Sequence, residues 1–275
     1  MRGYRIVVTH GNGPQVGSQL LRSEAGSSQT YTLPLDVCVA MTQGEIGYIL
    51  QTSLQSILRG KKIMTPVAGL ITQVVVDRHD PAFQHPTKPI GPFYSKESAD
   101  KKRDELGWDI VEDAARGYRR VVPSPMPLGV VELEIIQDCL ERNIIVIASG
   151  GGGIPVSIDG GTISGIEAVI DKDRASALLA GQLHIERFII STEVEQVYLN
   201  YKKPNQQALS QIDIDEAMIY YAEGHFLDGS MKPKIEAAIG FLKSGGIEVI
   251  ITDPGHIVEA LDGNAGTRIT GKGKL

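Results

Sequence analysis

Strand-like and helix-like runs alternate along most of the chain, and this alternation limits its possible folds more than any other feature. Residues 5–9 are β-rich and lead directly into a glycine-containing turn, after which Val16 and Leu20 fall at helical spacing. Pro14 suits the first turn of that helix. Residues 144–148 form a continuous apolar run, as expected for a strand that is buried on both faces. The alternation predicts an α/β fold with a parallel sheet covered by helices.

The remaining elements are predicted from the same spacing rules. We expect helices over residues 37–58, 130–142, 173–183, 213–223 and 233–243, and strands over residues 70–76, 187–191 and 247–252. The longest of these helices is expected to bury an apolar face formed by Met41, Ile46, Ile49, Leu50, Leu54, Ile57 and Leu58. No internal repeat and no low-complexity tract interrupts the pattern.

One segment, residues 78–128, does break the alternation. It is rich in charged residues and contains seven of the 14 prolines, at positions 81, 86, 89, 92, 123, 125 and 127. A structureless loop of this length is improbable in a compact domain. We therefore predict a small inserted lobe within a single domain that spans residues 1–275. The alternative is a solvated excursion of the surface.

Composition excludes several classes of protein. The net charge of −6 argues against a nucleic-acid-binding surface. The longest apolar runs are strand-sized, far short of the ~20 residues that a membrane span needs. Cys38 and Cys139 are the only two cysteines, and no secretory leader is recognisable. These features favour a reducing, cytoplasmic setting.

Two glycine clusters directly follow predicted strands. The first, over residues 11–17, has the spacing G-x-G-x-x-x-G, which is one residue longer than the dinucleotide-binding fingerprint. The second is four consecutive glycines at residues 150–153, at the end of a strand where ligands of open α/β sheets bind. Such turns let backbone N–H groups approach an anion. The plainer alternatives are a tight corner at the first cluster and a flexible loop at the second.

Three lysines are candidates for binding a phosphate. Lys172 stands between Asp171 and Asp173 at a predicted helix start. Asp173 could simply cap the helix while Asp171 pairs with Lys172, or a carboxylate could orient Lys172 as a phosphate clamp. Lys234 also begins a helix, where a lysine is unfavourable unless an anion is present. Lys88 is held between prolines in the inserted segment. Phosphoryl transfer needs positive charge around the moving group, so these lysines and the glycine turns indicate a phosphorylated ligand.

Other chemistries find little support in the sequence. The six histidines lack the spacing of metal ligands, and the two cysteines cannot form a zinc site. A G-x-S-x-G nucleophile elbow and a Walker-type phosphate loop are also absent. For His10 and His225 we expect polar-loop or packing roles.

The same clusters, in the same order, resemble those of the carbamate kinases, members of the amino-acid-kinase superfamily. The most specific strings are Pro-Thr-Lys-Pro-Ile-Gly-Pro-Phe at residues 86–93 and Asp-Lys-Asp at residues 171–173. The other matching stretches are residues 10–17, 41–48, 70–77, 119–125, 150–155, 167–173, 198–201 and 229–234. Together they span essentially the whole chain.

The resemblance implies a three-layer α/β sandwich with a mainly parallel open sheet and a small protruding subdomain formed by the insertion. It also implies reversible phosphoryl transfer between carbamoyl phosphate and ADP, giving ATP and carbamate, with Mg²⁺ and in a homodimer. ATP synthesis in a catabolic pathway, within arginine metabolism, is the implied direction. No nucleic acid and no membrane is expected as a partner.

The resemblance also implies roles for single residues. Lys172 and Lys234 match the lysines that neutralise the transferring phosphoryl group on the nucleotide side, and Asp171 matches the aspartate that orients them. Lys88 matches the lysine of the protruding subdomain that reaches the substrate. Tyr198 falls in the segment on the nucleotide side. The positions that match the substrate pocket are Gly11, Asn12, Gly151 and Gly152.

The sequence also departs from the family pattern. Members open with a strand, a Gly-Gly-Asn turn and a helix before the strand that corresponds here to residues 5–9, so we expect this chain to be short by about 40 residues at ordinary element lengths. Smaller departures are Met126 for a lysine, Glu193 and Glu195 in a segment that is usually Gly/Asp-Val-Asp, and Lys202 for a glycine. A second hypothesis is therefore a catalytically inactive relative that binds nucleotide or carbamoyl phosphate. A dinucleotide-dependent oxidoreductase is disfavoured by the glycine spacing.

Overall fold

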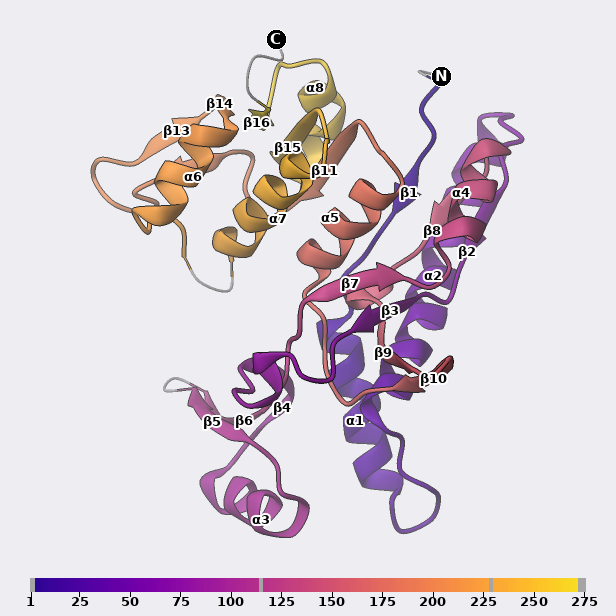
Figure 1. Ribbon diagram of the computed structural model, residues 1–275, viewed down its shortest axis with the longest axis vertical. Coiled ribbons are helices and arrows are strands. Elements are labelled where there is room, and N and C mark those ends of the chain that lie inside the picture. The colour runs from indigo at the N-terminus through magenta and orange to yellow at the C-terminus, as the bar shows by residue number, and fades with distance from the viewer. Residues whose placement is uncertain (1–2, 114–115, 228–229, 272–275) are drawn as a thin grey trace. The chain divides into compact units, whose positions relative to one another are not determined.

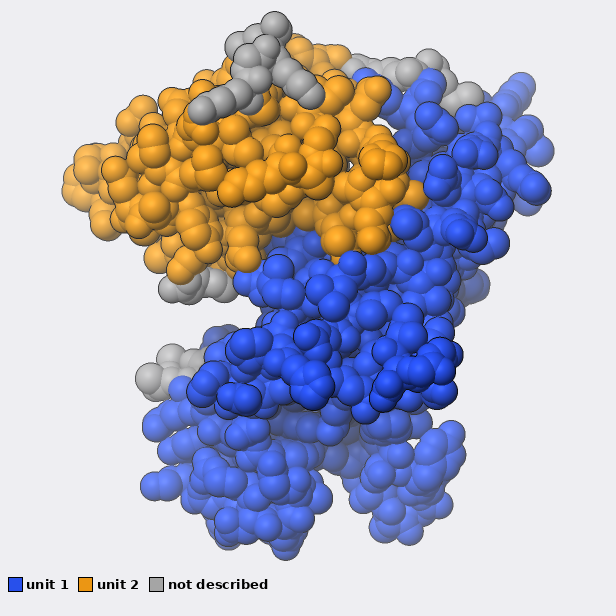
Figure 2. Space-filling view, in the orientation of Figure 1, with its two compact units in different colours: residues 1–175 blue, residues 176–275 orange. Residues whose placement is uncertain are grey.

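The computed structural model (Figure 1), which describes residues 3–113, 116–227 and 230–271, combines helices with sheets that contain parallel strand pairs. This confirms the α/β class. The chain divides into two compact units, unit 1 from Met1 to Ala175 and unit 2 from Ser176 to Leu275, coloured separately in Figure 2. The prediction of a single domain over residues 1–275 stays a prediction.

Unit 1 combines five helices with ten strands among its described residues. The helices are α1 (Gly13–Gly26), α2 (Leu35–Gly60), α3 (Lys96–Leu106), α4 (Leu133–Glu141) and α5 (Lys172–Gln182, which continues into unit 2), and the short 3-10 turns are η1 (Pro81–Phe83) and η2 (Gly150–Gly152). The strands are β1 (Val7–Val8), β2 (Val67–Gly69), β3 (Gln73–Val76), β4 (Lys88–Tyr94), β5 (Ile110–Asp113), β6 (Gly117–Val122), β7 (Pro127–Val130), β8 (Ile145–Ile147), β9 (Ile154–Asp159) and β10 (Thr162–Gly165). They form three sheets, with the strand orders β1-β8-β2, β10-β9-β3-β7 and β4-β6-β5.

The parallel strands of unit 1 bring the two glycine clusters together. β8 pairs in parallel with both β1 and β2, so that Val146 lies opposite Val7 and Ala68. Val146 is fully buried, as expected for this strand. Because parallel strands end at the same edge of a sheet, the loops that follow β1 and β8 lie side by side. These loops hold the two glycine clusters.

Residues 78–128, which we call the lobe, form regular structure instead of a long loop. β4 and β5 both pair antiparallel with β6, and Lys88 lies opposite Val122. The helix α3 begins after Ser95, whose hydroxyl accepts a hydrogen bond from the Ser98 N–H at 3.3 Å. It ends at Gly107, which adopts the left-handed conformation that favours glycine. The role of the lobe as a functional subdomain stays a prediction.

Unit 2 has its own sheet and core. Its strands are β11 (Arg187–Ser191), β12 (Val197–Leu199), β13 (Gln207–Leu209), β14 (Gln211–Asp213), β15 (Glu248–Thr252) and β16 (Thr267–Thr270), and its helices are α6 (Ile214–Ala222), α7 (Met231–Lys243), η3 (Pro254–His256) and α8 (Ile257–Leu261). The sheet has the order β11-β15-β16-β14. Ile235, Phe241, Val249, Ile251 and Ile269 are fully buried in its core. This packing fixes α7, the helix that carries Lys234, against the sheet.

Three predicted elements are clearly shorter in the structure, while the other predicted boundaries lie within two residues of the observed ones. Only Val7–Val8 of residues 5–9 pairs as a strand. The strand predicted over residues 70–76 begins at Gln73, because the chain passes there from one sheet to another. The helix predicted over residues 130–142 begins at Leu133, because Val130 instead pairs with Val74 at the end of β7. The apolar residues after Val130 have helical spacing, so the sequence pattern did not reveal that Val130 itself ends the short strand β7.

The apolar face predicted for α2 is correct only in part, because Ile46, Leu50, Leu54 and Leu58 are half-buried while its three other members are exposed. Met41, Ile49 and Ile57 are 43%, 54% and 56% exposed. The residues that α2 buries are Leu35, Cys38, Val39, Thr42, Gln43 and Gly47. The helix therefore turns a partly polar side inward, because the neighbour there is the backbone of the second glycine cluster and its polar groups require hydrogen bonds.

Candidate active site

The first glycine cluster forms an open turn between β1 and α1. Gly11 is exposed, and a Cβ at this position would lie 3.3 Å from Cδ of Lys172, so the aliphatic part of that lysine runs across the turn. Asn12 is buried and donates a hydrogen bond from Nδ2 to Oγ1 of Thr42 at 2.9 Å. Because α1 begins at Gly13, the positive end of its dipole lies at this turn. The turn therefore offers a favourable position for an anion.

The second glycine cluster is tightly packed and is not a flexible loop. Gly151 and Gly152 have φ values of +68° and +97°, which strain any other residue. A Cβ on Gly151 would lie 2.0 Å from Nδ2 of Asn12, and one on Gly152 would lie 2.4 Å from the carbonyl oxygen of Ile170. The second cluster thus contacts both the first cluster and the residue that precedes Asp171. Six of the predicted site residues, namely Gly11, Asn12, Gly151, Gly152, Asp171 and Lys172, consequently meet in one place.

A buried glutamine that the sequence analysis missed holds this cluster in place. The side chain of Gln43 donates from Nε2 to the carbonyl oxygens of Thr72 and Gly150, at 3.1 and 3.0 Å, and its Oε1 accepts from the N–H of Thr72 at 2.8 Å. The hydroxyl of Thr72 in turn accepts from the N–H of Ser149 at 3.0 Å. The signal available in the sequence was the adjacent pair Thr42 and Gln43 within an otherwise amphipathic helix.

We expect the substitution Gln43→Glu to destabilise the protein and loosen the second glycine cluster. Its carboxylate would face the carbonyl oxygens of Thr72 and Gly150 with no proton to donate. Each carbonyl keeps one backbone donor, the Ile154 N–H on Thr72 at 2.9 Å and the Gly153 N–H on Gly150 at 3.1 Å, but the buried carboxylate would repel both oxygens. This lowers the free energy of unfolding by about 2–4 kcal/mol. Denaturant unfolding at neutral pH measures this loss.

Gln51→Glu is the matched control, because it makes the same change on the same helix. Gln51 uses only its Oε1, which accepts from the N–H of Gly69 at 3.0 Å, and a carboxylate keeps that acceptor. Equal stabilities for the two variants would show that the donors of Gln43 are unimportant.

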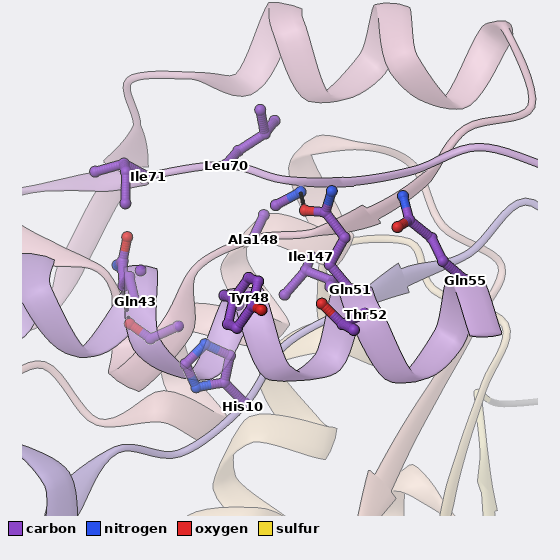
Figure 3. Close-up of a pocket in the computed structure, with 14 residues that line it drawn as sticks. His10, Gln43, Tyr48, Gln51, Thr52, Gln55, Leu70, Ile71, Ile147 and Ala148 are labelled. Carbon is purple, nitrogen blue, oxygen red and sulfur yellow. Dashed lines mark hydrogen bonds between the residues drawn. The ribbon is translucent and has the colours of Figure 1, made fainter. Parts of the chain in front are cut away.

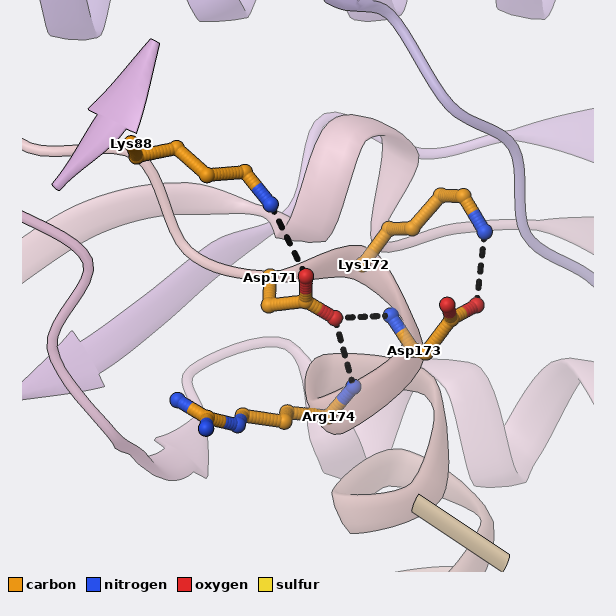
Figure 4. A network of polar contacts seen from close by, with 5 residues as sticks. All are labelled: Lys88, Asp171, Lys172, Asp173 and Arg174. Atoms are coloured by element: carbon orange, nitrogen blue, oxygen red, sulfur yellow. Dashed lines mark hydrogen bonds and ion pairs between the residues drawn. The ribbon is translucent and has the colours of Figure 1, made fainter. Parts of the chain in front are cut away.

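Two lysines and two aspartates form two ion pairs at the start of α5 (Figure 4). Lys88 of the lobe donates from Nζ to Oδ2 of Asp171 at 2.8 Å, and Lys172 donates to Oδ1 of Asp173 at 2.6 Å. The other oxygen of Asp171 accepts from the backbone N–H groups of Asp173 and Arg174, at 2.9 and 3.4 Å. Asp171 therefore caps α5 while Asp173 pairs with Lys172. Of the two possibilities that the sequence left open, the structure contradicts the one in which Asp173 caps the helix and Asp171 pairs with Lys172.

The environment of Asp171 keeps its carboxylate charged. Burial would raise its pKa, but the Lys88 ammonium and the two backbone N–H groups outweigh burial and hold the pKa below its ordinary value. The side chains of Lys88 and Lys172 are 37% and 42% exposed. Both ammonium groups thus remain accessible to an anionic ligand although each has a carboxylate partner.

We expect Lys88→Met to make the protein more sensitive to acid. The folded-state pKa of Asp171 lies below the unfolded value of about 4, so its ionisation stabilises the fold above that pH, and the contribution is lost as the pH falls through the folded pKa. Without Lys88 the pKa rises, so acid unfolding begins at a higher pH. Because Lys88 is more than one-third exposed, the loss at pH 7 is below about 1 kcal/mol. Circular dichroism against pH measures the midpoint, and an unchanged midpoint would argue against this coupling.

The remaining predicted residues lie in unit 2 or on the surface. Lys234 lies in the first turn of α7. Gly229, which precedes this helix, lies outside the described residues. Tyr198 lies in β12 with its ring centroid 5.8 Å from that of Tyr201. Lys202 adopts a left-handed φ of +61°, which explains why a glycine would be favoured at this position. The roles of Lys234 and Tyr198 stay predictions.

A groove of about 300 Å³ adjoins the second glycine cluster on the side of α2 (Figure 3). His10, Gln43, Tyr48 and Gly150 are among the residues that line it. Burial lowers the pKa of His10, and the hydrogen bond between Nδ1 and the Gly11 carbonyl oxygen opposes this only in part. The imidazole is therefore neutral at neutral pH. It adds no charge to the site.

Comparison with known proteins gives first the class and then the family. The amino acid kinase family model matches residues 1–253, which places the chain among the amino acid kinases. The carbamate kinase of Thermococcus kodakarensis is 50% identical over 269 residues, 97% of this chain and 85% of that relative. Carbamate kinase 2 of Enterococcus faecalis is 49% identical over 273 residues, 99% of this chain and 88% of the relative. The chain belongs to the carbamate kinases, and it is a phosphotransferase.

A solved structure supports the same assignment. The carbamate kinase from Giardia lamblia bound to AMP-PNP superposes with a TM-score of 0.93 at 42% identity, covering 98% of this chain and 86% of that chain. Both the family and the sandwich fold implied by the sequence motifs are therefore confirmed.

Proposed function

We propose that this chain transfers a phosphoryl group reversibly between carbamoyl phosphate and ADP, giving ATP and carbamate. The observation that carries the proposal is the convergence of two lysines from separate segments on the two glycine turns. Lys172 crosses Gly11, and Lys88 of the lobe reaches the neighbouring Asp171. Two accessible cations beside glycine turns are suited to a phosphorylated ligand.

The proposed roles follow from the contacts in unit 1. Lys172 neutralises the moving phosphoryl group, and Lys88 contacts carbamoyl phosphate from the lobe. Asp171 fixes Lys88 through their ion pair, while Asp173 orients Lys172. Gly11, Asn12, Gly151 and Gly152 line the substrate position. The N–H groups of Gly151 and Gly152 already donate to the carbonyl oxygens of His10 and Ser149, at 2.7 and 3.1 Å, so the absence of side chains at these two glycines is what makes room for the substrate. Lys234 and Tyr198 are assigned to the nucleotide side from the family resemblance alone.

The proposed transfer requires no proton. The bond from phosphorus to the carbamoyl oxygen breaks, its electron pair leaves on carbamate, and a β-phosphate oxygen of ADP bonds to phosphorus. The attacking oxygen is already anionic, so the enzyme needs to position the reactants and to neutralise charge. The neutral His10 is compatible with a mechanism without a general base.

We propose that Mg²⁺ enters together with the nucleotide, bound to its phosphates, as is usual for this ion. Among residues 3–113, 116–227 and 230–271, no group of three or more His, Cys, Asp or Glu side chains is arranged to hold a metal ion. We therefore assign no metal ligand to this chain.

We further propose that the enzyme is a cytoplasmic homodimer acting in arginine catabolism. Within the described part of the chain, no helix is long and apolar enough to cross a membrane. Val37, Met41 and Tyr48 are exposed and lie on one face of α2, because their spacing of four and seven residues matches helical turns. This face would suit a contact with a second copy. Light scattering combined with size-exclusion chromatography measures the mass in solution, and a monomer at all concentrations would contradict the dimer.

The decisive experiment is a coupled assay of ATP formation from carbamoyl phosphate and ADP with Mg²⁺. We expect ATP to appear at a rate proportional to enzyme, and none when carbamoyl phosphate is omitted. No turnover by enzyme that still binds ADP, measured by calorimetry, would contradict the proposal and favour the inactive relative.

A further inference from the structure

The lobe touches the rest of unit 1 at a second place, far from Lys88. The strand β4 begins at Lys88 and ends at Tyr94, and six residue steps of ~3.3 Å separate the two ends by up to about 20 Å. At the far end, the hydroxyl of Tyr94 donates to Oε1 of Glu24 on α1, at 3.1 Å. The strand that presents Lys88 is therefore tied to the body of the protein at both ends.

Glu24 is also paired with a lysine that sits among aromatic rings. Lys102 of α3 donates from Nζ to Oε2 of Glu24 at 2.7 Å, and both side chains are mostly buried, at 20% and 26% exposure. The Lys102 ammonium lies 4.9 and 4.8 Å from the ring centroids of Tyr94 and Trp108. Trp108 also contacts Arg120, whose guanidinium carbon is 4.4 Å from the ring centroid. Ion pairing and cation–π contacts together fix Lys102 in one position.

The electrostatic environment of the Glu24 carboxylate is unfavourable unless the lobe is docked. It lies in the last turn of α1, where the negative end of the helix dipole disfavours a carboxylate. Burial and the Glu24 carboxylate raise the pKa of Tyr94, so its hydroxyl remains protonated and can donate. The lobe thus supplies the cation and the donor that this carboxylate needs.

The middle of β4 also lies directly on α1. A Cβ on Gly17 would be 3.3 Å from Cα of Gly91, so the backbones of the helix and the strand approach closely. The first turn of α1 follows the glycine cluster at Gly11, and its last turn holds Glu24. The single helix α1 therefore links the first glycine cluster to the residue on which the lobe docks, Glu24.

We infer that Glu24 is a positioning residue, which latches the lobe onto α1 through Lys102 and Tyr94 and so holds Lys88 at the active site. The inference rests on the proposed function, in which Lys88 contacts carbamoyl phosphate. Glu24 itself touches no reacting group. Its effect is on the fraction of molecules whose lobe is docked, and apparent affinity falls in proportion to that fraction.

The test is the kinetics of Glu24→Gln, which keeps the size of the side chain but removes its charge. We expect KM for carbamoyl phosphate to rise about three- to tenfold, because bound substrate must now supply the docking energy. At saturation the lobe is docked again, so kcat and the KM for ADP stay within about twofold. General damage to the fold would instead lower kcat and leave KM unchanged, and that result would overturn the inference.

Two further variants sharpen the test. In a Lys88→Met background, Glu24→Gln should raise KM no further, because a latch acts only through Lys88, and an equal rise in both backgrounds would contradict this. Asp100→Asn is the matched control, since it breaks the ion pair of Asp100 with Arg103 inside α3 and should leave KM unchanged. Absence of turnover by the unaltered enzyme would refute the proposed function. Normal turnover with an unchanged KM for Glu24→Gln would refute only the latch.

Discussion

Replacing Lys172 with methionine is expected to lower kcat for ATP formation about 100- to 1,000-fold, the usual consequence of removing one electrostatic group that stabilises a transition state. The Lys172 side chain lies across Gly11, where a Cβ would be 3.3 Å from its Cδ. Methionine is unbranched and of similar length, so it fills this space while removing the ammonium. The backbone of the first glycine cluster should therefore keep its conformation. The coupled assay at saturating carbamoyl phosphate and ADP measures kcat.

Lys101→Met serves as the control for this substitution. Lys101 is 70% exposed on α3 and its contact with Glu105 is long, at 3.9 Å. We expect unchanged turnover and nearly unchanged stability for this variant. A Lys172→Met enzyme that turned over as fast as the control would remove Lys172 from the mechanism.

Gly152→Ala is expected to have the largest effect on stability, with a loss of about 2–5 kcal/mol. The added methyl group would lie 2.4 Å from the carbonyl oxygen of Ile170, so backbone must move. In addition, the φ of +97° is strained for alanine. Because Ile170 directly precedes Asp171, the displacement reaches the charged network, and kcat/KM should fall as well. Thermal unfolding and the coupled assay measure the two effects.

Gly160→Ala separates the steric clash from the backbone strain. Gly160 also has a positive φ, +54°, but a Cβ there would meet no atom within 4 Å. We expect a loss of only about 1–2 kcal/mol and normal kcat/KM. Equal melting temperatures for the two alanine variants would show that the contact with Ile170 is unimportant.

The parts of the fold that could be predicted are those where periodicity and end signals agree. The strand over residues 187–191 and the end of α7 at Lys243 were both placed correctly. The antiparallel hairpin of β9 and β10 was missed, although Gly160 and Gly161 both have positive φ, as a tight hairpin turn requires. Short strands bury few residues, so their pattern is weak. Their partners, which are distant in sequence, decide whether they form.

The residues of the candidate site likewise divide into those that could be predicted from the sequence and those that could not. Glycines and lysines at the ends of predicted elements could be identified, because a turn or a helix start has a local signature. The hydrogen bond from Gln43 to Gly150 joins residues 107 positions apart, and the ion pair of Lys88 with Asp171 spans 83. No local pattern encodes such contacts. The same limit explains why the sequence did not identify Lys88 as the partner of Asp171.

The position of Trp108 gives the protein an optical reporter. It is the only tryptophan of the chain, and in the lobe its ring contacts the cationic groups of both Lys102 and Arg120. Indole emission depends on nearby charge, so any rearrangement of Lys102 changes the fluorescence of this one residue. Docking of the lobe can therefore be followed in solution, in real time and without a label.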